Sequence, residues 1–336
     1  MMDERSRGIE PAQMLHSIGR AAVPGCESVA AIRRLTAGAN QETWAFDVVT
    51  PNGVLPLILR RAKGGTLQRA TGIGLEMEAH ILAAAGAAGV PTPEVVYVLG
   101  AEDGFGKGYV MRRIAGETLP HRILRGEDYA AARPLLAAQS GASLAAIHAV
   151  PTASVAGLAS FTPLSRVEWL QEQYLATQQV NPVFSWAFAW LRHHAPPPPA
   201  SPALVHGDFR HGNLMIGPEG IRAVLDWENA HIGDPAEDLG WLCVPSWRFG
   251  RLDQPVGGFG QRDELLAAYV AAGGVAPSPE RWRFWEAYGS LYWGVVCARS
   301  VCEFRSGSDP SLERALIARR ASECELDLLR LIAPRR

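Results

Sequence analysis

The sequence lacks what an oxidising compartment or a membrane would require. Its 336 residues include an odd number of cysteines and no C-x-x-C pair; the five are Cys26, Cys243, Cys297, Cys302 and Cys324. Such a set favours a reducing compartment over a disulfide framework. The first residues lead into no apolar segment, and no apolar run approaches the length of a membrane span. We therefore expect a cytoplasmic protein that makes no membrane contact.

An excess of positive charge is also lacking. The formal net charge is −2, which argues against a general nucleic-acid-binding surface. No G-x-x-x-x-G-K-[ST] motif occurs, so a P-loop enzyme is excluded. With 48% hydrophobic and 20% charged residues, the composition is that of a globular chain, long enough for two domains or two lobes around a cleft. The sequence leaves the oligomeric state open.

One stretch contains most of the side chains that could take part in catalysis. Asp208 follows a His-Gly pair, and Asn213 comes five residues later. The turn residues after Ile216 predict a hairpin of two short strands, 214–216 and 221–225. Such a hairpin would bring Asn213 close to Asp226 at its open end, beside Asp208. Two carboxylates and a carboxamide offer oxygen ligands for Mg²⁺ and one base, which phosphoryl transfer from a nucleotide needs.

The N-terminal part has the pattern of a β-sheet with one buried ion pair. After a helix within residues 1–27, the segment from Val29 to Arg61 favours strands, and residues 57–60 form a buried strand that ends in Arg60. A helix over 76–85 places Glu78 on its apolar face. Because a buried carboxylate needs a cationic partner, Arg60 is the natural candidate.

Beyond these strands the chain becomes mainly helical. We expect a hairpin of 95–98 with 108–114, helices ending near His148 and around 184–191, and a last helix over 311–332. Three Asp-Pro or Ser-Pro pairs predict helix N-caps, at Asp234, Ser278 and Asp309. The tryptophans of this part favour the core over a platform for substrate: Trp241, Trp247, Trp282, Trp285 and Trp293. The predicted domains are residues 1–113, an N-terminal lobe, and residues 114–336, a C-terminal lobe.

Together, the His-Gly-Asp motif with Asn213, the Leu225-Asp226-Trp227-Glu228 strand end and the Gly233-Asp234-Pro235 segment resemble the aminoglycoside phosphotransferase family. Within it, the pattern is most similar to the kinase-like domain of certain acyl-CoA dehydrogenase-associated proteins. The resemblance implies an α+β, protein-kinase-like bilobal fold with a β-rich N-terminal lobe, a larger helical C-terminal lobe and ATP between them.

The resemblance also implies roles for individual residues. Asp208 would be the catalytic residue that accepts the proton of the acceptor hydroxyl, and Asn213 and Asp226 would hold Mg²⁺. Arg60 would contact the α- and β-phosphates, with Glu78 fixing its direction. Many relatives have lysine at that strand position, and the planar fork of arginine is not equivalent to it; Arg61 is a rival for the same role.

Further roles follow from position in the motifs. The backbone at Gly38, Ala39 and Asn40 would cover the phosphates, and the backbone from Met111 to Arg113 would meet the nucleotide base. The remaining candidates are possible acceptor contacts, namely Arg210, His211 and Glu228, and structural supports, namely His206, Asp234 and Asp238.

On these grounds we expect an ATP- or GTP-dependent, Mg²⁺-dependent kinase for a small-molecule hydroxyl. One alternative is a metal-dependent hydrolase built on His206, Asp208 and His211; another is a catalytically silent nucleotide-binding module. The segment 241–305 is rich in aromatic and aliphatic residues with scattered arginines. We therefore expect an acceptor that is partly apolar or anionic, such as an acyl thioester, and not a polycationic aminoglycoside.

Overall fold

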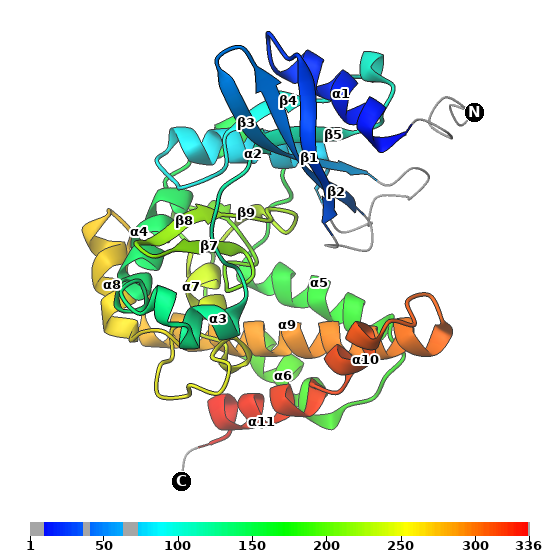
Figure 1. The fold of residues 1–336 in the computed structure, drawn as a ribbon. Coiled ribbons are helices and arrows are strands. Elements are labelled where there is room, and N and C mark those ends of the chain that lie inside the picture. Colours follow the sequence, from blue (N-terminus) through cyan, green and yellow to red (C-terminus); the bar gives the residue numbers. More distant parts are fainter. Residues whose placement is uncertain (1–9, 36–40, 63–72, 335–336) are drawn as a thin grey trace. The chain divides into compact units, whose positions relative to one another are not determined.

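The structure, a computed structural model, describes residues 10–35, 41–62 and 73–334 (Figure 1). The chain divides into two compact units: unit 1 contains Met1–Gly116 and Arg222–Asn229, and unit 2 contains Glu117–Ile221 and Ala230–Arg336. The sequence placed the division after residue 113 and assigned Asp226 to the C-terminal part. The compact units instead divide after Gly116, and Asp226 belongs to unit 1.

Unit 1 contains a five-stranded antiparallel sheet with the order β1-β2-β3-β5-β4. The strands are β1 Ser28–Leu35, β2 Gln41–Thr50, β3 Gly53–Ala62, β4 Val95–Val98 and β5 Gly108–Arg112. Strand β3 lies at the centre, and its register sets Arg60 opposite Thr43 of β2 and Tyr109 of β5. The two strands predicted at 95–98 and 108–114 pair as expected, although β5 ends two residues earlier, at Arg112.

Among its described residues, unit 1 also contains the α-helices α1 Pro11–Ala22 and α2 Leu75–Ala87. Helix α1 contributes Met14, Leu15 and Ile18 to a core that includes Phe46 of β2 and Leu57 of β3. Burial of these apolar side chains fixes the helix on one face of the sheet.

Unit 2 is mainly helical. Its helices are α3 Pro120–Arg125, α4 Leu136–His148, α5 Pro163–Leu175, α6 Pro182–His193, α7 Ala236–Leu242, α8 Arg262–Ala271, α9 Pro279–Ser306, α10 Leu312–Ala318 and α11 Ala321–Ile332. Short strands β6 Ala203–Val205 and β9 His231–Gly233 pair with each other, and β7 Leu214–Gly217 pairs with β8 Gly220–Val224. The β7–β8 pair is the hairpin that the sequence predicted; the division between the units passes through β8.

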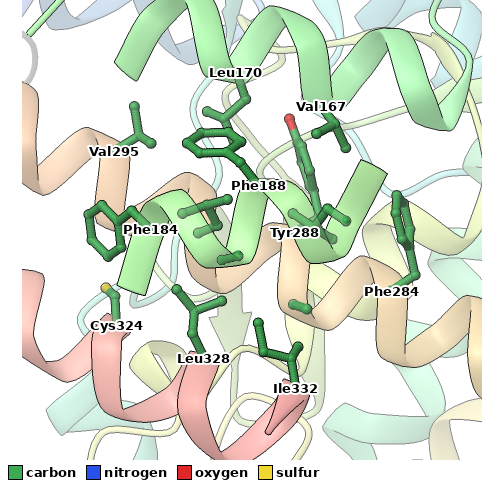
Figure 2. Close-up of a cluster of buried hydrophobic side chains, with 14 of the residues drawn as sticks. Val167, Leu170, Phe184, Phe188, Phe284, Tyr288, Val295, Cys324, Leu328 and Ile332 are labelled. Atoms are coloured by element: carbon green, nitrogen blue, oxygen red, sulfur yellow. The ribbon is translucent and has the colours of Figure 1, made fainter. Parts of the chain in front are cut away.

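The 28-residue helix α9 is central to the packing of unit 2. Figure 2 shows side chains of α5, α6 and α11 meeting those of α9 in one buried cluster. Phe188 of α6, Tyr288 of α9 and Leu328 of α11 are members, and each is at most 2% exposed. Ala236 of helix α7 belongs to the same cluster, so α9, packed against α5, α6 and α11, supports α7 from a rigid base.

Cap residues begin several of these helices. The Ser278 hydroxyl accepts the Arg281 amide at 3.2 Å, with Pro279 in the first turn of α9, as predicted. The prediction at Asp309 was wrong, because Ser311 caps α10 and accepts the Arg314 amide at 3.3 Å. The predicted last helix over 311–332 is likewise two helices, α10 and α11.

In the described part of the chain, every helix is too short or too polar to cross a membrane.

Candidate active site

Arg60 lies near the end of β3 and joins three elements of unit 1. Its Nε and Nη2 donate to Gln41 Oε1 at 3.2 and 2.7 Å, and Nη2 also donates to Asp226 Oδ1 at 3.2 Å. Its Nη1 lies 3.1 Å from Glu78 Oε1. Three guanidinium nitrogens are therefore engaged in different directions. A lysine ammonium lacks this planar fork and could not reproduce the arrangement.

Arg61, the rival candidate, has different partners. Its guanidinium contacts the Glu42 carboxylate at 2.8 Å and donates to the Phe105 carbonyl at 3.2 Å. Successive side chains of a strand point to opposite faces, which separates the two arginines. Of the two, Arg60 is the one that lies with Glu78 and Asp226.

Glu78 is buried, with 1% of its surface exposed, in the first turn of α2. Burial raises the pKa of Glu78 to about 7, although Arg60 opposes the shift. Burial alone would lower the pKa of Arg60, but Glu78 and Asp226 outweigh it and raise that pKa further. The arginine therefore stays charged, while the carboxyl group of Glu78 titrates close to neutral pH.

Asp226 has an unusual backbone conformation. Its φ of 61° lies in the left-handed region, which aspartate tolerates better than most residues. The conformation turns the chain sharply just after β8, and the carboxylate accepts the hydrogen bond from Arg60. A strained residue held by a specific contact is a frequent sign of a functional position.

In unit 2, Asp238 holds the loop that follows β6. Its carboxylate accepts the His206 amide at 2.8 Å and the Gly207 amide at 2.9 Å, and His148 Nε2 lies 3.2 Å away. Burial alone would raise the pKa of Asp238, but the hydrogen bonds of His148 and the backbone lower it below its ordinary value. A buried, ionised carboxylate thus fixes the two residues before Asp208.

The Asp208 carboxylate accepts four hydrogen bonds within unit 2. Oδ1 accepts Arg210 Nε at 2.8 Å and Trp241 Nε1 at 3.0 Å. Oδ2 accepts Asn213 Nδ2 at 2.7 Å and Arg210 Nη2 at 3.2 Å. Asn213 Nδ2 also donates to the backbone carbonyl of Asp208 at 2.9 Å. The amide of Asn213 is therefore oriented with its nitrogen on Asp208 and its oxygen available to a cation.

Two histidines of the loop are directed into the interior of unit 2. His206 Nδ1 accepts the Asp208 amide at 3.2 Å. His211 is fully buried, and its Nε2 lies 2.7 Å from the Gly257 carbonyl. Burial lowers the pKa of His211 to about 4, so its ring is neutral and donates to that carbonyl. A buried, committed His211 is poorly placed for the acceptor contact that the sequence predicted.

The hydrolase alternative required His206, Asp208 and His211 to form a metal site. Over the ranges that the structure describes, no group of three or more His, Cys, Asp or Glu side chains is arranged to hold a metal ion. Instead, both histidine rings hydrogen-bond to the backbone.

Asp234 connects α7 with α9. Its Oδ1 accepts the Ala236 amide at 3.1 Å, which is a cap-type contact, and its Oδ2 accepts Trp285 Nε1 at 2.8 Å. Arg281 forms an ion pair with the same oxygen. These contacts support the helix that carries Asp238 and Trp241.

The remaining predicted residues lie elsewhere. Gly38, Ala39 and Asn40 lie outside the described residues. Met111 pairs with Ile58 of β3 and with Val95 of β4 within the sheet.

Arg113 follows β5 in unit 1. Its amide donates to the Pro56 carbonyl at 3.0 Å, and its guanidinium contacts Asp47 at 2.7 Å. The carbonyl of Glu228 accepts the Ile73 amide at 3.4 Å. The amide of Arg113 is thus already used within unit 1.

Sequence reasoning missed Trp241. It was assigned to the core with the other tryptophans, and it is indeed buried, yet its indole N–H donates to Asp208. Its position three residues after Asp238 in α7 is the one signal that could have placed it near the loop.

A family model described as the phosphotransferase enzyme family matches residues 31–285. That range covers most of the chain, including the Arg60 and Asp208 arrangements. The chain belongs to this family.

Solved structures share the fold. A candidate aminoglycoside phosphotransferase from Ralstonia eutropha JMP134 has a TM-score of 0.75 at 21% identity, over 95% of this chain and 97% of its own. A thermostable mutant of aminoglycoside phosphotransferase APH(4)-Ia, solved with AMP-PNP and hygromycin B, has a TM-score of 0.61 at 19% identity, over 95% and 99%. The predicted α+β, protein-kinase-like fold is confirmed.

Curated relatives are longer proteins. Acyl-CoA dehydrogenase family member 10 of Mus musculus is 29% identical over 250 residues, which is 69% of this chain and 23% of the relative. Acyl-CoA dehydrogenase family member 11 of Gallus gallus is 28% identical over 224 residues, 62% of this chain and 27% of the relative. The chain therefore spans about a quarter of the length of these two relatives.

Proposed function

We propose that this chain transfers the γ-phosphoryl group of ATP or GTP to a hydroxyl group of a small molecule, with Mg²⁺ as the metal. The observation that carries the proposal is the Asp208 carboxylate, held by Asn213, Arg210 and Trp241 in a loop whose backbone Asp238 fixes. Family membership supports the reaction class.

In the proposed reaction, Asp208 accepts the proton of the acceptor hydroxyl. The hydroxyl oxygen forms a bond to the γ-phosphorus, the bond from that phosphorus to the β,γ-bridging oxygen breaks, and the nucleoside diphosphate leaves. A base positioned in this way contributes about 10²–10⁴-fold to the rate. Its immobilised carboxylate also orients the hydroxyl for in-line attack.

Asn213 and Asp226 are the proposed magnesium ligands, as the resemblance to the family implies. The donor set fits the ion, because Mg²⁺ prefers carboxylate and carbonyl oxygens, and Asn213 has its amide nitrogen committed to Asp208. When bound, the ion would neutralise the charge that develops on the phosphates.

Arg60 is the proposed contact for the α- and β-phosphates, and Glu78 and Gln41 hold its direction. The backbone of Gly38, Ala39 and Asn40 is proposed to cover the phosphates, and the segment from Met111 to Arg113 to meet the base. The relative APH(4)-Ia was solved with AMP-PNP, which supports nucleotide use by this chain.

For the acceptor, we propose a partly apolar or anionic hydroxyl compound, with Arg210 and Glu228 as contacts. The environment of Asp208 in unit 2 supports this class. Arg210 stacks on Trp247 at 4.7 Å, and Trp241 packs against the same ring. An arginine on an aromatic surface attracts anions and apolar groups and repels a polycation.

Nucleotide binding is tested first, by thermal melting with ATP–Mg²⁺ and, separately, with Zn²⁺. We expect stabilisation by the nucleotide. Stabilisation by zinc alone would instead favour the hydrolase alternative.

Turnover of ATP by wild type and by Asp208→Ala is then compared over a library of small alcohols, carboxylated alcohols and aminoglycosides. We expect a loss of about 10²-fold or more in the variant. Nucleotide binding without turnover would indicate a silent module, and an aminoglycoside as the preferred acceptor would contradict the proposed acceptor class.

A further inference from the structure

The carboxylate of Asp208 is saturated with donors. It accepts four N–H groups, two from Arg210, one from Asn213 and one from Trp241. Two carboxylate oxygens offer about four lone-pair positions in total. A substrate hydroxyl can therefore bond to this carboxylate only after one donor has left.

Arg210 is the donor best suited to leave. It lies in the same loop, two residues after Asp208, and its side chain is 26% exposed. Its guanidinium keeps a bond to the His211 carbonyl at 2.7 Å and its stacking on Trp247. Because these two contacts can persist, the guanidinium of Arg210 needs only a small shift to leave the Asp208 carboxylate.

Trp241 is the donor best suited to remain. Its ring is buried in unit 2, 5.0 Å from the ring of Trp247 and edge-on to Tyr292 at 5.4 Å. The residue belongs to α7, the helix whose Asp238 holds the backbone before Asp208. Moving the indole would open a packed aromatic cluster, which costs far more than rotating a loop side chain.

We propose that Trp241 is a positioning residue for Asp208. Its indole N–H anchors Oδ1, so that the carboxylate keeps its direction when Arg210 yields its place to the acceptor hydroxyl. One helix, α7, then sets the backbone of the loop through Asp238 and the side chain of the base through Trp241. The anchor itself is a property of unit 2; the exchange with a hydroxyl rests on the proposed phosphotransferase function.

The alternative is that Trp241 only fills space. Trp293 provides the matched control, because it belongs to the same aromatic cluster and its Nε1 is buried with no partner within the described ranges. Replacing either tryptophan by phenylalanine removes an indole N–H and keeps an aromatic ring. Both changes remove packing from the same cluster, and only Trp241→Phe removes a bond to Asp208.

The first measurement is independent of activity. In a proton–nitrogen NMR spectrum of the indole groups, Trp241→Phe identifies the signal of residue 241, and Trp293→Phe identifies that of residue 293. We expect the Asp208→Ala substitution to move the first signal upfield, since a charge-assisted hydrogen bond is lost, and to leave the second in place. An unchanged signal of Trp241 would overturn the proposal.

The second measurement is the steady-state consumption of ATP–Mg²⁺ with the best alcohol of the library, or with water where no alcohol is used. We expect Trp241→Phe to lower kcat about tenfold with KM for ATP unchanged, because one hydrogen bond to a charged group is lost. Trp293→Phe should match wild type. Equal kcat values in the two variants would refute the positioning role. A wild type that consumes no ATP would contradict the proposed function, while the NMR result would still decide the anchor.

Discussion

Two arginines contact carboxylates of the candidate site, and their surroundings differ. In unit 1, Arg60 joins Gln41, Glu78 and Asp226, which come from three separate segments. In unit 2, Arg210 contacts Asp208 across two residues of one loop. The first arrangement exists only when the sheet and α2 are assembled, whereas the second is largely local. We expect changes at Arg60 to act on stability, and changes around Arg210 to act mainly on turnover.

The largest effect on stability is expected from Arg60→Met. This substitution leaves the buried Glu78 without its cation, a change that costs about 3–5 kcal/mol in comparable buried pairs. Urea unfolding of the variant measures the loss. Arg61→Met is the control, because its ion pair with Glu42 is closer to the surface and should contribute about 1 kcal/mol or less. Equal losses in the two variants would contradict the comparison.

A smaller, pH-dependent effect is expected at Glu78. Its pKa is raised to about 7 from an ordinary value of 4.5, so the folded chain holds this proton more tightly than the unfolded chain. The resulting stabilisation is fully present below pH 4.5 and is lost as the pH rises through 7. Roughly 3 kcal/mol should disappear across this window in wild type relative to Glu78→Gln.

Melting of the two proteins between pH 4.5 and 8 measures this difference. If their melting temperatures follow parallel curves, Glu78 does not titrate in this range. The group would then behave as a permanently ionised partner of Arg60.

The smallest effect on stability is expected from Gly212→Ala. Gly212 has a φ of 93°, which costs an alanine about 1–2 kcal/mol, and the added methyl would lie 3.0 Å from Arg210 Nη1. Gly104→Ala is the matched control, with a φ of 72° and no atom within 4 Å of the added methyl. Both should lose similar stability by urea unfolding, but only Gly212→Ala should change ATP turnover. A change in turnover in both variants would mean that backbone strain at a positive φ, and not the contact of the added methyl with Arg210, lowers turnover.

Much of the fold could be predicted because periodic patterns report burial directly. The alternation in β2 and the apolar stripe that includes Glu78 gave the sheet and α2, and the stripe also gave the pairing with Arg60. Boundaries that depend on side-chain competition were harder to predict. At the start of α10, Ser311 and Asp309 both offer a cap oxygen, and only the folded geometry decides that Ser311 caps the helix.

In the candidate site, too, some residues could be predicted from the sequence, and others depend on the folded geometry. The residues of the Asp208 loop and its support Asp238 were found from their motif. Trp241 was not, because a buried tryptophan that donates a hydrogen bond has the same sequence pattern as one that only packs. His211 was placed near the acceptor from its position in the loop, and its burial against Gly257 could not be read from that position.

Arg60 has a consequence for chemical labelling. The sequence contains two lysines, Lys63 and Lys107, and Lys107 is exposed in a pair with Glu76. A nucleotide analogue with an amine-reactive acyl phosphate modifies a nucleophilic amine next to the phosphates, and a guanidinium, which stays protonated, does not react in its place. With Arg60 in its proposed role beside the phosphates, surveys that detect nucleotide-binding proteins through acylated lysines would therefore not register this position. Substituting Arg60→Lys would introduce an amine at that position, and mass spectrometry of the labelled protein would locate it.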